Sequence, residues 1–277
     1  GVLLHNGQFR EDVVDLYIPG RGLDFVWKRS YQSGNASSLN GFLGKGWDFS
    51  FGAHFIVTTI SGVTKGIFSR GDGRRDYYQN VTYQGSSYVF QTHPAGYYDI
   101  KTEYSTSTNA VTQTKSNGFR QEFDLTTGIL KNRKDRYGNL LSFSYNASGK
   151  LTKIIDTLSR NITIAYYTSG VGNGRIQTIT DFANRVVTYA YAEYYPGGTV
   201  VLTKVSYPPT DWVNEAGTPQ TNVSRTVQYT YDGLPGRLLT IVDGRGKTRI
   251  ENVYDGNGRV DYQRNYSSGS VYHNFDW

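Results

Sequence analysis

Histidine and aspartate are the residue types of this sequence that could supply acid–base chemistry or bind a metal ion. The histidines lie far apart in the chain, without His-x-His or His-x-x-x-His spacing: His5, His54, His93 and His273. Four aspartates recur in equal phase, each five residues after a leucine or isoleucine: Asp135, Asp156, Asp181 and Asp243. Equal phase in successive repeats predicts a series of turn caps, in preference to paired carboxylates or calcium ligands.

Other catalytic signatures are weak. The glycine-rich segments 71–76 and 243–249 superficially resemble phosphate-binding loops, but neither fits G-x-x-x-x-G-K-[ST]. The chain has no G-x-S-x-G and no evident set of nucleophile, base and orienting residue. The sequence therefore predicts a protein that is not an enzyme and has no cofactor or metal site.

The composition favours strands joined by tight turns. The chain has 277 residues with 24 Tyr, 13 Phe, 32 Gly and only 7 Pro, and aromatic residues suit a pleated, half-buried surface. It has no Cys, which excludes disulfides and Cys-ligated zinc, and no Met, which leads us to expect a piece of a longer protein. No apolar run approaches the roughly 20 residues that span a bilayer, so we expect no membrane span.

The net charge of +6 is spread along the chain, because Lys and Arg are interleaved with acidic residues. A basic balance can attract nucleic acid, yet no basic cluster stands out. The pattern favours solvated outer faces of a β-protein, and it disfavours nucleic acid as a partner.

The aspartates belong to a longer repeat. Asp135, Asp156 and Asp181 are each followed by a tyrosine ten residues later. Apolar and polar residues alternate between these points, and Asn, Asp and Gly supply the turns. The expected repeat positions are Asp135, Tyr145, Gly149, Leu151, Asp156, Tyr166, Ile176, Asp181, Tyr191, Tyr231, Gly236, Leu238, Asp243, Tyr254 and Gly258. A period of about 21 residues accommodates one β-hairpin, and a hairpin alone is barely stable, so successive hairpins must pair edge to edge.

These residues resemble a known repeat. "YNASGKLTKIID", "YDGLPGRLLTIVDGRG" and "YDGNGRV" are similar to the YD repeat of bacterial Rhs and wall-associated proteins, Tc toxin BC components and teneurins. The segments 15–33 and 41–51 resemble the region that often precedes YD repeats in Rhs proteins. We therefore expect residues 1–120 to form an Rhs-type N-terminal β region, and residues 121–277 to form YD-repeat hairpins with an inserted loop at 208–222.

The resemblance implies an all-β architecture of consecutive antiparallel hairpins that wind as a curved, spiralling strip, part of a β-shell. Bacterial relatives enclose a C-terminal toxin in such a shell, and teneurins use a similar one in adhesion. The chain lacks the Asp-Pro dipeptide that marks self-cleavage in toxin-releasing Rhs proteins. The expected partner is the remainder of its own polypeptide: further repeats and an encapsulated C-terminal segment.

Tryptophan and tyrosine provide candidate binding residues. Trp27 and Trp47 lie in the front motifs and are expected as core anchors, whereas Trp212 lies in the Pro-rich insertion. An exposed Trp can stack on a sugar or anchor a protein partner, so Trp212, Tyr194 and Tyr195 are the predicted ligand-binding residues.

Two hypotheses of function follow. The first is a non-catalytic structural module of a secreted or cell-surface Rhs/YD-repeat protein, bacterial in origin, that encapsulates or displays a toxin-like segment. The alternative is an adhesion module that binds carbohydrate or a cell-surface protein through its tyrosine-rich face and the Trp212 loop.

Overall fold

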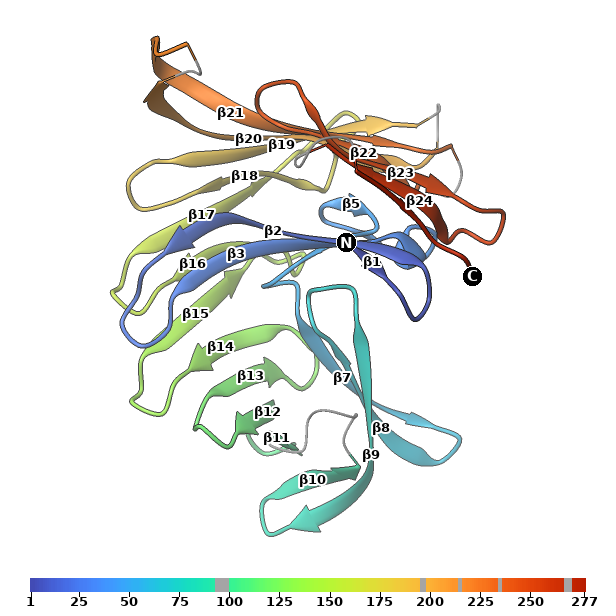
Figure 1. The fold of residues 1–277 in the computed structure, drawn as a ribbon. Coiled ribbons are helices and arrows are strands. Elements are labelled where there is room, and N and C mark those ends of the chain that lie inside the picture. Colours follow the sequence, from blue (N-terminus) through green and yellow to red (C-terminus); the bar gives the residue numbers. More distant parts are fainter. Residues whose placement is uncertain (93–99, 195–197, 214–215, 234–235, 267–270) are drawn as a thin grey trace. The chain divides into compact units, whose positions relative to one another are not determined.

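The chain folds almost entirely into antiparallel β-strands connected by tight turns (Figure 1). The computed structural model describes residues 1–92, 100–194, 198–213, 216–233, 236–266 and 271–277. Within these residues the only helical element is a short 3-10 turn, η1 (Ser33–Asn35), and no helix is long and apolar enough to cross a membrane. From residue 54 onward, strands pair with their sequence neighbours, which confirms the predicted all-β fold of antiparallel hairpins.

The chain divides into two compact units, each assembled from separate segments. The first unit comprises Gly1–Asp15, Ser30–Asp48 and Ile164–Trp277, and the second comprises Leu16–Arg29 and Phe49–Thr163. Four strands run from one unit into the other: β2 (Gln8–Ile18), β3 (Phe25–Gln32), β6 (Trp47–Phe49) and β17 (Asn161–Tyr166). The predicted boundary at residue 120, between the N-terminal β region and the repeats, is based on sequence motifs and stays a prediction. The two compact units follow other boundaries.

The second unit is a strip of hairpins with an aromatic interior. Its strands are β7 (His54–Ile60), β8 (Val63–Ser69), β9 (Arg75–Gln84), β10 (Ser87–Thr92), β11 (Ile100–Ser105), β12 (Ala110–Lys115), β13 (Arg120–Asp124), β14 (Leu130–Lys134), β15 (Leu140–Tyr145) and β16 (Leu151–Ile155). The N–H of Phe55 on β7 donates to Gly128 O at 2.9 Å, in the turn between β13 and β14, so this strip turns back on itself.

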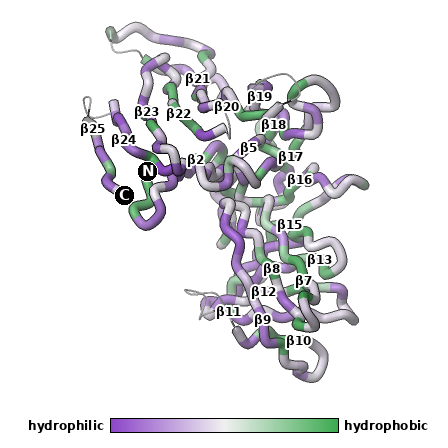
Figure 2. The backbone as a smooth tube through the Cα atoms, turned by 90° about the vertical axis from the view of Figure 1, so that its right-hand side faces the viewer, coloured by the Kyte–Doolittle hydropathy of each residue, from purple (hydrophilic) through white to green (hydrophobic). Residues whose placement is uncertain are grey.

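Rings fill the space that this turning creates. The buried cluster takes side chains from seven strands and the segment before β7: Ala53, Phe55, Phe68, Tyr78, Phe90, Val111, Phe123 and Leu130. Strand residues alternate between faces, and Figure 2 shows hydrophobic colour returning at intervals along the strands. The inward positions of different hairpins therefore build one core, which no hairpin could bury alone.

The first unit combines a repeat sheet with N-terminal elements. The sheet contains β18 (Ile176–Thr180), β19 (Val186–Glu193), β20 (Val200–Val213), β21 (Pro219–Tyr231), β22 (Leu238–Val242), β23 (Thr248–Tyr254), β24 (Val260–Asn265) and β25 (Val271–Asn274). The N-terminal elements include the short strands β1 (Val2–Leu3), β4 (Asn40–Gly41) and β5 (Gly44–Lys45).

The predicted inserted loop at 208–222 is wrong, because most of this segment is strand. β20 continues through Val213, and β21 begins at Pro219. Two shifts of register, between Ser206 and Pro209 and between Thr210 and Trp212, accommodate the Pro-rich sequence. Proline lacks an N–H and is tolerated in sheets at such irregularities. The insertion therefore lengthens one hairpin.

Candidate functional sites: repeat turns, tyrosine contacts and a cationic pocket

The repeat aspartates hold turns. Asp156 is almost fully buried, and its Oδ1 accepts the N–H groups of Leu158 and Arg160, both at 2.9 Å. The same arrangement, with N–H donors two and four residues later at 2.8 to 3.1 Å, recurs at Asp135, Asp181, Asp243 and Asp255. Each carboxylate therefore satisfies two backbone donors that a reversing chain leaves without a strand partner.

The residue four positions after the aspartate completes the turn, and our sequence analysis missed it. Arg160 Nε donates to Asp156 Oδ2 at 2.7 Å, and Arg185 Nε donates to Asp181 Oδ2 at 2.7 Å. In the turn of Asp135 an amide takes this place, since Asn139 Nδ2 donates to Asp135 Oδ2 at 2.7 Å. The Asp-x-x-x-Arg/Asn spacing, visible in the sequence, could have revealed this contact.

These hydrogen bonds stabilise the ionised carboxylates. The side-chain amide of Asn139 is the main cause of the lowered pKa of Asp135, and the backbone N–H of Thr127 is the main cause of the lowered pKa of Asp124. Both pKa values therefore move away from the range of a general acid at neutral pH. Gly149 and Gly258 lie in the turns that follow Tyr145 and Tyr254, with φ of 72° and 81°, a conformation that favours glycine.

The repeat tyrosines close the other end of the hairpins. The hydroxyl of Tyr145 donates to Leu130 O at 2.7 Å, and that of Tyr191 donates to Ile176 O at 2.7 Å. Tyr254 donates likewise to Leu238 O at 2.9 Å. In each case the acceptor lies near the start of the preceding strand, so the aspartate fixes the turn and the tyrosine fixes the open end of the same hairpin.

The long hairpin of β20 and β21 keeps the tyrosine contact although its turn has moved outward. Tyr207 stands where the spacing expects aspartate, and the chain continues as strand. The hydroxyl of Tyr231 nonetheless donates to Leu202 O at 2.6 Å. The ring of Tyr166 lies edge-on against Phe42 at 5.6 Å between ring centroids.

A shift of register accompanies the tyrosines. Tyr145 pairs with Leu151, Tyr231 pairs with Leu238, and each pairing follows a β-bulge. Gly236 and Leu238, two of the predicted repeat positions, are buried beside this bulge. A bulge increases local twist and re-aims a side chain, which helps the hydroxyl reach the neighbouring strand.

The N-terminal segment of the first unit contacts the repeats through buried polar groups. The N–H of Leu238 donates to the Tyr31 hydroxyl at 2.8 Å, and Trp47 Nε1 donates to the Tyr231 hydroxyl at 2.9 Å. Trp27, in the second unit, and Trp47 are both fully buried, which confirms them as core anchors. Gly46 has φ of 72°, and a Cβ there would lie 2.5 Å from the Tyr31 ring, so only glycine leaves room for it.

A buried carboxylate adds to these contacts. Asp15 Oδ2 accepts the Tyr189 hydroxyl and Asp15 Oδ1 accepts the Tyr207 hydroxyl, both at 2.8 Å. Two hydroxyl donors compensate part of the cost of burying this charge. These contacts join residues 174 and 192 positions apart, which explains why local sequence reasoning missed them.

The predicted ligand-binding residues are not brought together as a described site. Trp212 belongs to β20 and its backbone pairs with Gln220, while its side chain and Tyr195 lie outside the described residues. Tyr194 follows β19, is exposed, and donates its backbone N–H to Thr199 O at 2.9 Å.

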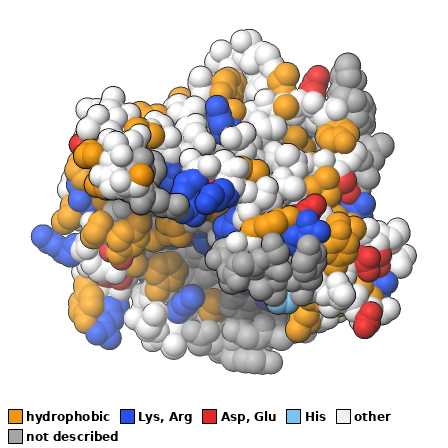
Figure 3. Space-filling model, turned by 45° about the horizontal axis from the view of Figure 1, so that its top comes forward, with side chains coloured by type: hydrophobic (Ala, Val, Ile, Leu, Met, Phe, Trp, Pro, Cys, Tyr) orange, Lys and Arg blue, Asp and Glu red, His pale blue; other side chains and the backbone are white. Residues whose placement is uncertain are grey.

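Titratable clusters do not suggest a metal centre in the part of the chain that the structure describes, where no group of three or more His, Cys, Asp or Glu side chains is placed to hold an ion. His54 Nδ1 lies 3.4 Å from Gly52 O, His5 and His273 are exposed, and His93 lies outside the described residues. Over the face drawn in Figure 3, Lys and Arg side chains are interspersed with hydrophobic and acidic ones.

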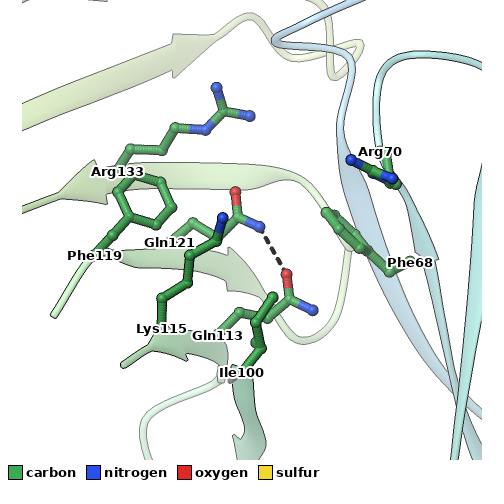
Figure 4. A pocket seen from close by; sticks show the side chains of 8 residues that line it. All are labelled: Phe68, Arg70, Ile100, Gln113, Lys115, Phe119, Gln121 and Arg133. Carbon is green, nitrogen blue, oxygen red and sulfur yellow. Dashed lines mark hydrogen bonds between the residues drawn. The ribbon is translucent and has the colours of Figure 1, made fainter. Parts of the chain in front are cut away.

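A cation-lined pocket in the second unit was not predicted from the sequence. It has a cavity volume of about 200 Å³ and lies between β8 and the strands β12 to β14 (Figure 4). Its lining residues are Phe68, Arg70, Ile100, Gln113, Lys115, Phe119, Gln121 and Arg133. The residues come from five separate stretches of the chain, so only the folded sheet assembles them.

The chain is similar to one family model and to solved structures. Residues 1–78 match the family model described as "Domain of unknown function (DUF6531)". A search of curated proteins finds no match to this sequence. A solved structure described as "Crystal Structure of TcdB2-TccC3" is similar with 11% sequence identity and a TM-score of 0.27, over 99% of this chain and 21% of that chain. The chain thus spans about one fifth of the length of that protein.

Proposed function

We propose that this chain is a non-catalytic structural module of a secreted or cell-surface Rhs/YD-repeat protein of a bacterium. Together with further repeats of its own polypeptide it would build a β-shell that encapsulates or displays a C-terminal, toxin-like segment. The observation that carries the proposal is the use of the repeat residues: aspartates hold turns, and tyrosine hydroxyls hold the open ends of hairpins. The repeat aspartates and tyrosines therefore stabilise a strip of successive hairpins.

The resemblance of the N-terminal motifs and of the repeats to Rhs sequences supports the biological class that we propose. A strip of hairpins can be extended by adding further copies, because every copy contacts mainly its neighbours. Such a strip suits a wall around another segment, since its stability does not depend on the sequence that it surrounds.

The test is protection of the enclosed segment in the native protein. The protein is isolated from its source, treated with a protease for increasing times, and the fragments are identified by mass spectrometry. We expect a segment outside the repeats to be digested slowly in the wild type and much faster when Trp47→Ala loosens the wall. Tyr137→Phe is the control, because Tyr137 is 73% exposed.

Equal digestion of all segments in the wild type and in Trp47→Ala would contradict encapsulation. Detection of the chain only in the cytosol after fractionation of cells would contradict the proposed location.

The long β20–β21 hairpin supports the second candidate, an adhesion module, because it extends a strand pair beyond the length of its neighbours. Under this hypothesis Trp212→Ala and Tyr194→Ala weaken binding to a carbohydrate array or to a cell-surface protein. Binding that neither substitution changes would remove these residues from the candidate site.

A further inference from the structure

In the second unit, two adjacent rows of cross-strand partners run across strands β11 to β14. One row is polar and the other is apolar. Cross-strand pairing aligns Thr102 with Gln113, Gln113 with Gln121, and Gln121 with Arg133, across strands β11 to β14. The neighbouring row is apolar and runs through Tyr104, Val111, Phe123 and Leu130, with a β-bulge between Glu122 and Phe123. Burying a polar row next to a hydrophobic core is costly unless each group finds a partner.

Most of the polar row is satisfied by its own members. Gln113 is 3% exposed, and its Nε2 donates to the Tyr78 hydroxyl at 3.0 Å and lies 3.3 Å from Thr102 Oγ1. Gln121 Nε2 donates to Gln113 Oε1 at 2.7 Å, the contact dashed in Figure 4. Burial raises the pKa of Tyr78 to about 12, so its hydroxyl stays neutral in this network.

Arg133, at the end of the row, is only partly satisfied. Its Nη2 donates to Ser50 O at 2.9 Å, and its guanidinium lies 5.2 Å from the Phe51 ring centroid. Its Nε is buried without a hydrogen-bond partner, and no described carboxylate forms an ion pair with it. Burial lowers the pKa of Arg133 to about 10, which still leaves it charged at neutral pH. A half-buried charge without a counter-ion is a costly arrangement that an anion would relieve.

The rest of the pocket extends this positive character. Lys115 Nζ lies 5.8 Å from the Phe119 ring centroid, and Arg70 lines the opposite wall after β8. None of the described side chains that line the pocket is acidic. The nearby Asp76 is already paired with Arg74 at 2.6 Å. An anion entering the pocket would therefore meet Lys115 of β12 and Arg133 of β14.

The residues that line the pocket indicate which class of anion it could bind. The guanidinium fork suits a planar carboxylate, and Phe119 and Phe68 offer apolar faces to a ring. Gln121 Oε1 adds an acceptor for a hydroxyl group. Two further cavities, of about 480 and 290 Å³, share Phe119 with this pocket.

We propose that this pocket binds an acidic sugar, with its carboxylate against Arg133 and Lys115 and its ring against Phe119. The site is independent of Trp212 and Tyr194, and it gives the structural module a binding capacity of its own. The apolar face of a sugar suits Phe119, its carboxylate suits Arg133 and Lys115, and its hydroxyl groups suit Gln121.

The test is calorimetric titration of the folded chain with D-glucuronate, with D-glucose as the uncharged control. We expect glucuronate to bind and glucose to bind at least about tenfold more weakly. Separate titrations with N-acetylglutamate and inorganic phosphate distinguish the source of the charge. Tighter binding of either one than of glucuronate would overturn the assignment to an acidic sugar, and so would a lack of glucuronate binding.

Variants locate the site. Arg133→Met is expected to weaken glucuronate binding about tenfold or more, because it removes the unpaired charge. Gln121→Glu places a carboxylate opposite Arg133 on the neighbouring strand, and it is expected to abolish binding while the chain stays folded. Lys101→Gln is the matched control, since Lys101 is exposed and pairs with Glu103 at 2.9 Å outside the pocket. Unchanged affinity in Arg133→Met and Gln121→Glu would overturn the proposal.

Discussion

The two compact units differ in which segments of the chain fill the interior of their sheets. In the second unit, one buried aromatic cluster is built by the hairpins, with Phe55 touching the rings of Phe68, Tyr78, Phe90 and Phe123 at centroid distances of 5.4 to 6.0 Å. In the first unit, the N-terminal segment fills the space and is bound through polar atoms of Tyr31, Trp47 and Asp15. A segment from elsewhere in the chain can therefore pack against a repeat sheet and complete its core.

The largest expected effect comes from removing a central ring in either unit. Phe55→Ala and Trp47→Ala should each lower the free energy of unfolding by about 3–5 kcal/mol, because each leaves a large cavity. Hydrogen exchange measured by mass spectrometry should show the loss of protection first in the unit that carries the substitution. Equal loss in both units for both variants would show that the units do not differ as described.

The buried carboxylate should come next. Asp15→Ala leaves the hydroxyls of Tyr189 and Tyr207 without their acceptor and should cost about 3 kcal/mol, which denaturant unfolding measures. Asp12→Ala is the control, because Asp12 is exposed at the surface. A cost below about 0.5 kcal/mol for Asp15→Ala would mean that polar binding of the N-terminal segment contributes little.

Single tyrosine contacts should contribute less. Tyr191→Phe and Tyr254→Phe each remove one hydroxyl that donates to a backbone carbonyl, so each should cost about 1 kcal/mol. Their effects should add, because the two residues lie in separate hairpins. Phe123 occupies the corresponding bulge in the second unit and pairs with Leu130 without any hydroxyl. Tyr137→Phe should change stability by less than about 0.5 kcal/mol.

Acid should weaken both units through the turn aspartates. The pKa values of Asp124 and Asp135 in the second unit, and of Asp243 and Asp255 in the first, are lower than usual in the folded chain. Folding therefore favours the ionised forms, and this stabilisation is present above the usual Asp pKa of about 3.9 and lost as the pH falls below it. Urea midpoints measured from pH 7 to pH 2.5 should decrease mainly below about pH 4.

A matched variant identifies the cause of the acid effect. Asp135→Asn keeps an acceptor oxygen but cannot be ionised, so the midpoint of this variant should fall less between pH 4 and pH 2.5. An identical decrease in the wild type and in the variant would assign the acid sensitivity to other groups.

The sequence predicted what is local. The interval from Leu130 to Asp135 to Tyr145 marks one hairpin, and turn chemistry depends on residues only a few positions apart. The strand period and the glycine turns were sufficient for the all-β fold. The predicted loop at 208–222 failed because proline suggests a break, whereas bulges let Pro209 pair with Ser224 inside a strand ladder.

Long-range contacts could not be predicted from one sequence. The partner of Tyr31 lies 207 residues away, and nothing in either local segment identifies the other. The cationic pocket could not be predicted for the same reason. Arg70, Lys115 and Arg133 look like ordinary surface residues in the sequence, and only strand pairing brings them together. The sequence therefore suggested only aromatic residues such as Trp212 as binding residues.

The most direct test of the binding of the N-terminal segment by the repeats is the exchange rate of one amide, the N–H of Leu238, followed by nuclear magnetic resonance. This N–H donates to the Tyr31 hydroxyl. In Tyr31→Phe we expect its exchange to become about tenfold faster, while the amide of Ile154 in the second unit keeps its rate. Unchanged exchange of Leu238 in Tyr31→Phe would contradict the conclusion that this segment completes the repeat sheet.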